Sequence, residues 1–222
     1  MKDMKNLIYI FSCASLLLFQ SCRPSEQERM ERLLNQWHGK EIQFPKDAKF
    51  TVYGEDTVEM EIPSENYKIV HYLDSTGCTT CKMNLGRWKT FIGYMDSVSQ
   101  GSVSCFIYIH AKRKRDVKIA LKEECFDYPV CLDTNDELNR LNGFPLNPVF
   151  QTMLLDKDNK VVAMGDPVKN PKVKELYLNV IAGRKTQTEM EHTKTTAEVS
   201  HATIDLGTFH WKENQDTIVT LM

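Results

Sequence analysis

Residues 67–91 read YKIVHYLDSTGCTTCKMNLGRWKTF and combine an apolar run, a turn and two closely spaced cysteines. The run 67–73 has the β-branched and aromatic content of a buried strand, and residues 74–77 interrupt it with turn-forming side chains. Cys78 and Cys81 follow where we expect the next helix to begin, and we expect that helix to extend to about Val98. The stretch therefore predicts a strand, a Cys-x-x-Cys turn and a helix.

This position favours redox chemistry at the two cysteines. The first N–H groups of a helix have no partner inside the helix, and its dipole places partial positive charge there. Such a setting lowers a cysteine pKa from about 8.5 to roughly 3.5–7.5, and Lys82 adds a nearby cation. Two intervening residues bring Cys81 beside Cys78, so we expect Cys78 to attack and Cys81 to resolve in thiol–disulfide exchange.

Two other interpretations of the cysteine pair remain open. The pair could be half of a zinc site, with His71 or His110 as a distant ligand, but no second Cys-x-x-Cys motif follows. The pair could also be a purely structural disulfide, although closing so short a loop stabilises a chain little. We assign no metal to the site.

The N-terminus has the pattern of a secretory signal peptide over residues 1–21. A short basic segment precedes the apolar run 7–19, which is too short to span a bilayer. Ser21 and Cys22 at its end resemble the lipobox of bacterial lipoproteins. That resemblance implies that the signal is removed and that Cys22 becomes a lipidated N-terminus, with several acyl chains giving a stable anchor. An ordinary cleavage site or a signal anchor stays open.

Export sets the redox conditions for the rest of the chain. We expect a periplasmic protein, anchored by lipid to the cell membrane or to the inner face of the outer membrane. An exposed cysteine pair in an oxidising compartment needs a redox partner protein to hold it in one state. Among the other cysteines, Cys105 lies in an apolar run and is expected to be buried and inert, while a disulfide between Cys125 and Cys131 is left open.

The order of strand, turn, Cys78, Cys81, Lys82 and helix resembles the redox site of the thioredoxin superfamily. A second stretch, TMLLDKDNKVV at residues 152–162, is similar to a segment of the membrane-tethered TlpA/ResA-type branch. The resemblance implies a cis-proline facing the cysteines. Pro148 is the candidate, although a count without a gap reaches Phe150, and the alternative is a site that lacks a cis-proline.

The sequence departs from the family pattern at several positions. Thr76-Gly77 stands where an aromatic residue usually precedes the first cysteine, and Thr79-Thr80 replaces the common Gly-Pro or Pro-Pro. The family also places an acidic group near the resolving cysteine. The corresponding positions hold residues without a carboxylate: Tyr72, Asn84 and Leu85.

Hydrophobic periodicity along the chain predicts an α/β protein. After a tether at residues 22–40, which includes a helix at 26–37, we expect one domain at 41–183. It begins with a β-hairpin within residues 41–62 and continues as a thioredoxin fold, with a mixed central sheet and helices on both faces. Residues 184–200 are polar and predict a linker. Residues 201–222 predict two strands that resemble the start of an Ig-like domain found in Bacteroidetes lipoproteins.

Charge gives little support to nucleic-acid binding. The chain carries a formal net charge of −2, and its basic cluster at residues 112–115 precedes an amphipathic pattern. We interpret the cluster as a solvated helix start.

The sequence thus predicts a membrane-anchored thiol–disulfide oxidoreductase without a cofactor, acting on disulfides or thiols of exported proteins. Two alternatives remain. One is a redox-inactive binding protein with the same fold, and the other is a metal-delivery protein that uses the Cys-x-x-Cys pair.

Overall fold

The computed structural model describes residues 25–76 and 83–183, and the chain forms two compact units, residues 1–33 and 34–222. Helix α2 (Glu26–Trp37) crosses the boundary between them. In the first unit its side chains are mostly exposed, with ion pairs at neighbouring turns such as Arg29 to Glu26 at 3.4 Å. The predicted signal peptide, Cys22, the linker 184–200 and the strands within 201–222 all lie outside the described residues.

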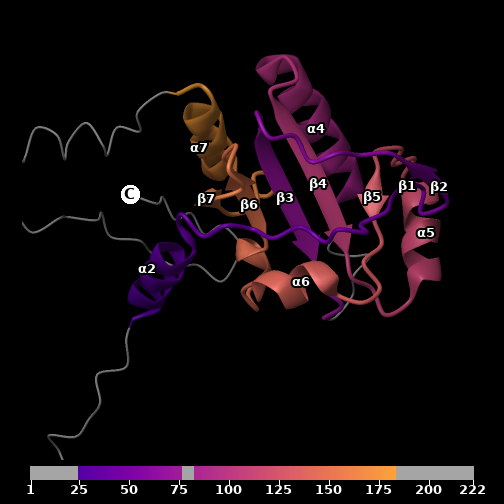
Figure 1. Cartoon of the computed structure of the whole chain (residues 1–222), viewed down its shortest axis with the longest axis horizontal. Coiled ribbons are helices and arrows are strands. Elements are labelled where there is room, and N and C mark those ends of the chain that lie inside the picture. Colours follow the sequence, from indigo (N-terminus) through magenta and orange to yellow (C-terminus); the bar gives the residue numbers. More distant parts are fainter. Residues whose placement is uncertain (1–24, 77–82, 184–222) are drawn as a thin grey trace, which may run out of the picture. The chain divides into compact units, whose positions relative to one another are not determined.

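A seven-stranded mixed sheet forms the second unit, in the order β2-β1-β5-β4-β3-β6-β7 (Figure 1). The central strands β3, β4 and β5 are parallel, and β1, β2, β6 and β7 add antiparallel pairs at the two sides. The strand bounds are β1 (Phe50–Val52), β2 (Asp56–Val58), β3 (Tyr67–Leu73), β4 (Val103–Ile109), β5 (Val130–Cys131), β6 (Thr152–Leu155) and β7 (Val161–Met164).

The remaining elements are helices that join these strands. Their bounds are α4 (Leu85–Ser99), α5 (Lys114–Glu123), α6 (Glu137–Asn142), η1 (Pro148–Phe150) and α7 (Pro171–Ile181). The predicted order of a hairpin followed by alternating strands and helices is confirmed, as is the α/β fold class. Among the residues that the structure describes, no helix is long and apolar enough to cross a membrane.

Helices α4, α5 and α7 contribute to the core on one face of the sheet. Alternate residues of β3 and β4 point to this face because side chains in a strand alternate between the two faces. Cys105 is among them and is 4 % exposed. Burial raises the pKa of the Cys105 thiol to about 12, and the expectation of a buried, inert thiol is confirmed. The helix residues of this core are Trp88, Phe91, Met95, Val117, Leu121, Val173, Leu176 and Tyr177.

Aromatic side chains cover the opposite face. Trp37 stacks on Phe144 with ring centroids 5.7 Å apart, and Phe144 stacks on Tyr72 at 4.9 Å. Phe50 of the hairpin packs edge-on against Tyr108, with 5.4 Å between centroids. The N-terminal hairpin is thus part of the sheet and of its core. Helix α6 lies near the carboxyl ends of β3 and β4 (Figure 1), where it closes this face.

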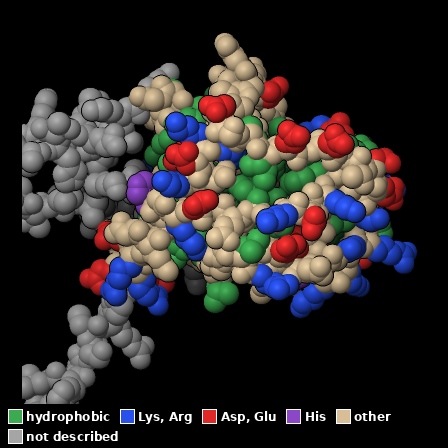
Figure 2. Space-filling model, in the orientation of Figure 1, with side chains coloured by type: hydrophobic (Ala, Val, Ile, Leu, Met, Phe, Trp, Pro, Cys, Tyr) green, Lys and Arg blue, Asp and Glu red, His purple; other side chains and the backbone are tan. Residues whose placement is uncertain are grey.

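Charged side chains of both signs are intermixed over the face that Figure 2 shows. The basic cluster of the sequence lies where α5 begins, and Arg113 pairs with Asp116 at 2.7 Å. This arrangement agrees with the interpretation of a solvated helix start.

Candidate functional site

The candidate site lies where the parallel strands β3, β4 and β5 end. Cys78, Cys81 and Lys82 follow β3 in the sequence and fall within residues 77–82, outside the described residues. The structure nevertheless describes the segments that lead into and out of this stretch, and the loops beside it.

Helix α4 does not begin where we expected it to begin. Its first residue is Leu85, and Asn84 before it has left-handed backbone angles, with φ 45° and ψ 42°. A residue in this conformation interrupts a right-handed helix, so the expectation of one unbroken helix from Cys78 to Val98 is wrong at Met83 and Asn84. The N-terminus of α4 is therefore separated from Cys78 in the sequence, and its dipole acts within its own first turn.

The loop after β3 is tied to the loop before β6 through Gln151. The Gln151 Nε2 atom donates to Asp74 Oδ2 at 3.2 Å and to the carbonyl oxygen of Pro145 at 2.9 Å. Its backbone carbonyl accepts from the Tyr72 N–H at 2.9 Å, one step beyond the β3–β6 ladder. Gln151 was not predicted as a site residue. Counting the register back from the strand at 152–155 would have placed it beside β3.

Pro148 opens the 3₁₀ helix η1, just before β6. The Asn147 side chain accepts a hydrogen bond from the Val149 N–H at 3.1 Å and caps this turn. No peptide bond in the described residues is cis. The preferred expectation of a cis-proline at Pro148 is therefore wrong, and the alternative of a site without one holds for this loop. Proline at the first position of a helical turn is favourable because its missing N–H would have no partner there.

Tyr72, six residues before Cys78, faces the sheet surface that carries the aromatic residues rather than α4. Its hydroxyl donates to Asp136 Oδ1 at 2.5 Å. Burial, the hydrogen bond to Asp136 and nearby carboxylates raise the pKa of Tyr72 far above its ordinary value. Tyr72 therefore keeps its proton at neutral pH and does not replace the acidic group of the family pattern.

His110 follows β4 and lies beside the end of β3. Its backbone N–H donates to the Leu73 carbonyl at 2.8 Å, and its ring atom Nδ1 lies 2.9 Å from the Asp133 carbonyl oxygen. A carbonyl only accepts, so Nδ1 carries the hydrogen. Asp133 in turn accepts from the Glu137 and Leu138 N–H groups at the start of α6.

His71 is buried under the other face, against α4. Its ring lies 4.3 Å from the Trp88 ring, and its Nδ1 is 2.7 Å from Thr152 Oγ1. Burial lowers the pKa of His71 to about 4. His71 and His110 are on opposite sides of the site, and no group of three metal-ligating side chains occurs within residues 25–76 and 83–183.

The open question of a second disulfide is answered by the free thiols. Cys125 is exposed and Cys131 is buried, and both are free, as is Cys105. No bond therefore joins Cys125 to Cys131.

No family model and no curated protein matches this sequence. Several solved structures are similar to it in fold. The thioredoxin domain of the thiol-disulfide oxidoreductase BVU-2223 from Bacteroides vulgatus is 15% identical, with a TM-score of 0.46, and the match covers 67% of this chain and 98% of that one. StoA from Bacillus subtilis is 17% identical, with a TM-score of 0.41 and coverage of 53% and 86%.

A third similar structure is the peroxidoxin BcpB from Mycobacterium tuberculosis, at 13% identity, a TM-score of 0.45 and coverage of 67% and 98%. The chain has a thioredoxin-like fold. Its mixed sheet, built from a hairpin followed by alternating strands and helices, is the arrangement that the sequence predicted. Because proteins of one fold differ in activity, function has to come from the site.

Proposed function

We propose that the protein is an exported thiol–disulfide oxidoreductase, anchored to a membrane through lipid at Cys22. It acts on disulfides of other exported proteins through Cys78 and Cys81, and a redox partner protein renews its cysteines. The observation that supports this proposal most is the placement of the pair in the sequence. It lies between β3, which ends at Leu73, and α4, which begins at Leu85, in a thioredoxin-like sheet.

The exchange itself needs no cofactor. The Cys78 thiolate attacks one sulfur of a client disulfide, which forms a mixed disulfide and releases the other client sulfur as a thiolate that takes up a proton. Cys81 then loses its proton and attacks Cys78, so the second client sulfur leaves as a thiolate and is protonated. Two electrons and two protons pass to the client, and Cys78 and Cys81 end as a disulfide.

Two features of the described residues suit contact with a polypeptide client. Leu146, in the loop before η1, is 95 % exposed although it is apolar. A hollow of about 540 Å³ lies between the first turn of α4 and the end of α5, lined in part by Asn84, Arg87 and Glu124. Exposed apolar side chains and open hollows near reactive groups are common in recognition surfaces.

A redox titration tests the proposal. The chain from Arg23 to Met222 is equilibrated with glutathione or dithiothreitol buffers, and the oxidation state of each cysteine is read by alkylation and mass spectrometry. We expect a two-electron transition between roughly −270 and −180 mV that is lost in Cys78→Ser. The matched control is Cys125→Ser, because Cys125 is an exposed thiol outside the pair.

The late start of α4 favours one second candidate, a binding protein in which Cys78 and Cys81 form a structural disulfide. The dipole of α4, which begins at Leu85, acts within its own first turn, so this helix contributes little to lowering the Cys78 pKa. A potential far below −270 mV, or a Cys78 pKa near about 8.5, would favour this candidate and overturn the enzyme proposal. Metal delivery by the pair and one histidine would appear instead as metal-dependent protection of both thiols.

A further inference from the structure

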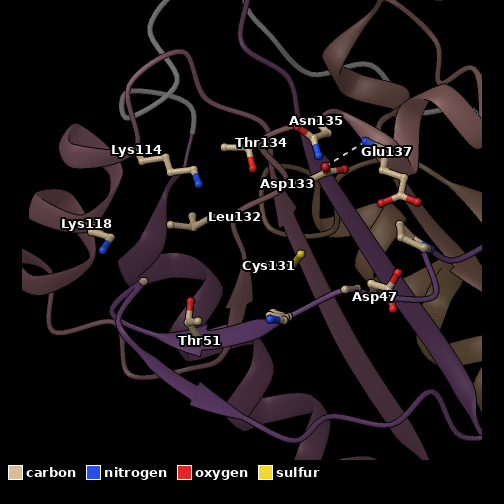
Figure 3. Close-up of a pocket in the computed structure, with 14 residues that line it drawn as sticks. Asp47, Thr51, Lys114, Lys118, Cys131, Leu132, Asp133, Thr134, Asn135 and Glu137 are labelled. Atoms are coloured by element: carbon tan, nitrogen blue, oxygen red, sulfur yellow. Dashed lines mark hydrogen bonds between the residues drawn. The ribbon is translucent and has the colours of Figure 1, made fainter.

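A pocket of about 340 Å³ lies between the β1–β2 hairpin and the start of α5 (Figure 3). Its lining also includes the segment that follows β5 and the first turn of α6. Pockets of roughly 300 Å³ or more are large enough for small ligands.

Unpaired charges of opposite sign occupy opposite walls of this pocket. Lys114 and Lys118 reach in from α5, while Asp47 and Glu137 stand across from them (Figure 3). None of these four side chains forms an ion pair or a hydrogen bond with another described residue. Neighbouring lysines are paired elsewhere, as Lys122 is with Glu55 at 2.8 Å. Lys49 and Asp133 also line the pocket, and the Asp133 carboxylate already accepts from the Glu137 and Leu138 N–H groups. Lys114 and Lys118 on one wall and Asp47 and Glu137 on the other are therefore the charges that we assign to a ligand.

The floor of the pocket adds a thiol, and a buried hydroxyl lies on the neighbouring strand β4. Cys131 lies in the pocket and is 6 % exposed. Tyr108 is its register partner on β4, so the two side chains share a face of the sheet. Tyr108 is fully buried, and its hydroxyl has no hydrogen-bond partner in the described part of the chain.

We propose that this pocket binds a short peptide with free termini, of about two residues. The carboxylate of the peptide pairs with Lys114 and Lys118, and its ammonium group pairs with Asp47 and Glu137. Charged hydrogen bonds at both ends fix the orientation of such a ligand. The pocket volume of about 340 Å³ is large enough for a molecule of this size.

The binding involves no covalent step at Cys131. Burial raises the pKa of the Cys131 thiol to about 12, so it stays protonated and acts as part of the floor. The site is consequently independent of the proposed exchange at Cys78 and Cys81.

Binding is tested by titrating the full chain with Ala-Ala and following chemical shifts by NMR. N-acetyl-Ala-Ala lacks the ammonium group and Ala-Ala-amide lacks the carboxylate, so each removes one end of the recognition. We expect saturable shifts with Ala-Ala and affinity at least about threefold weaker with each blocked peptide, the scale of a partly exposed ion pair. Equal binding of N-acetyl-Ala-Ala would mean a simple anion site and would overturn the proposal, as would the absence of saturation.

Variants locate the binding within the chain. Lys118→Gln should weaken the binding of Ala-Ala but leave the already weak binding of Ala-Ala-amide unchanged, because that peptide lacks the carboxylate. Glu137→Gln should weaken the binding of Ala-Ala but leave the already weak binding of N-acetyl-Ala-Ala unchanged, because that peptide lacks the ammonium group. The matched control is Arg115→Gln, because Arg115 is an exposed cation on α5 that does not line the pocket. If Arg115→Gln weakens Ala-Ala as much as Lys118→Gln does, the attraction is a general effect of charge and the proposal fails.

Thiol labelling gives a second readout in the same chain. We expect Ala-Ala to slow alkylation of Cys131 at least about threefold, in proportion to the occupied fraction. Cys105 is the internal control, because it is also buried and free but belongs to the core on the other face. Equal slowing of both thiols would indicate general stabilisation of the fold, and unchanged labelling of Cys131 at saturation would place the peptide elsewhere.

Discussion

Among single residues, His71 has a role that the sequence did not predict. The sequence offered it only as a possible distant metal ligand, whereas the structure buries its ring against Trp88. It is surrounded by Trp88 of α4, Thr152 of β6 and the more distant charges of Asp166 and Lys169. Its Nε2 atom has no hydrogen-bond partner among the described residues. Burial of the ring therefore disfavours the charged form and couples folding to pH.

We expect the free energy of unfolding to fall as pH falls from about 6.5 to 4. The pKa of His71 is lowered in the folded chain from 6.5 to about 4, so the unfolded chain takes up the proton first. The contribution of His71 is fully present above pH 6.5 and is lost on acidification, by up to about 3 kcal/mol. Denaturant unfolding at several pH values measures this loss.

The variant for this measurement is His71→Gln, which keeps a polar group beside Thr152 but does not titrate in this range. Carboxylates destabilise both the unchanged chain and His71→Gln at low pH. The contribution of His71 is therefore the difference between their two profiles of unfolding free energy against pH. Parallel profiles for His71→Gln and the unchanged chain would show that His71 is not the titrating group.

At the scale of elements, the end of α5 shows how a local motif determines a helix boundary. Glu123 is the last helical residue, and Cys125 has a left-handed backbone with φ 49°. The Cys125 N–H donates to the Lys122 carbonyl, and the Phe126 N–H donates to the Leu121 carbonyl. These two bonds form a Schellman motif, with Leu121 and Phe126 both buried. The sequence gave no sign of this conformation, which glycine usually adopts.

Cys125→Gly is expected to stabilise the protein by about 1 kcal/mol, because glycine adopts left-handed angles without the steric cost of a β-carbon. Denaturant unfolding measures the change in the free energy of unfolding. Reducing conditions prevent disulfide exchange from contributing to the result. Cys125→Ala is the control, since it removes the same thiol and retains the β-carbon. Equal stability of the Gly and Ala variants would show that the backbone at Cys125 carries no such cost.

At the scale of the whole molecule, the sequence predicted the fold well because its long apolar runs are unambiguous. The run that became β4 is buried on both faces of the sheet, and the hairpin signals at β1 and β2 were equally clear. Around the site the prediction was weaker, because contacts such as Gln151 to Asp74 join residues 77 positions apart. The start of α4 was misplaced for a local reason: the left-handed Asn84 has no sequence signature strong enough to separate a turn from a helix.

Trp37 and the start of α2 lead to a prediction about where the folded unit begins. The compact second unit starts at Leu34, and Trp37 is 3 % exposed, with its ring stacked on Phe144 and the Lys40 ammonium 3.7 Å from its centroid. A chain that begins at Leu34 should therefore keep its free energy of unfolding within about 1 kcal/mol, since the residues removed from α2 are mostly exposed.

Trp37→Ala in the longer chain should cost about 3–5 kcal/mol, the usual loss when a large buried aromatic side chain is truncated. Denaturant unfolding of both proteins, with m-values compared, gives the two losses directly. A truncated chain as unstable as Trp37→Ala would mean that the earlier residues of α2 belong to the folded unit. The segment before Leu34 would then be part of the domain, and it would not serve only as a spacer between the domain and the anchor that we propose at Cys22.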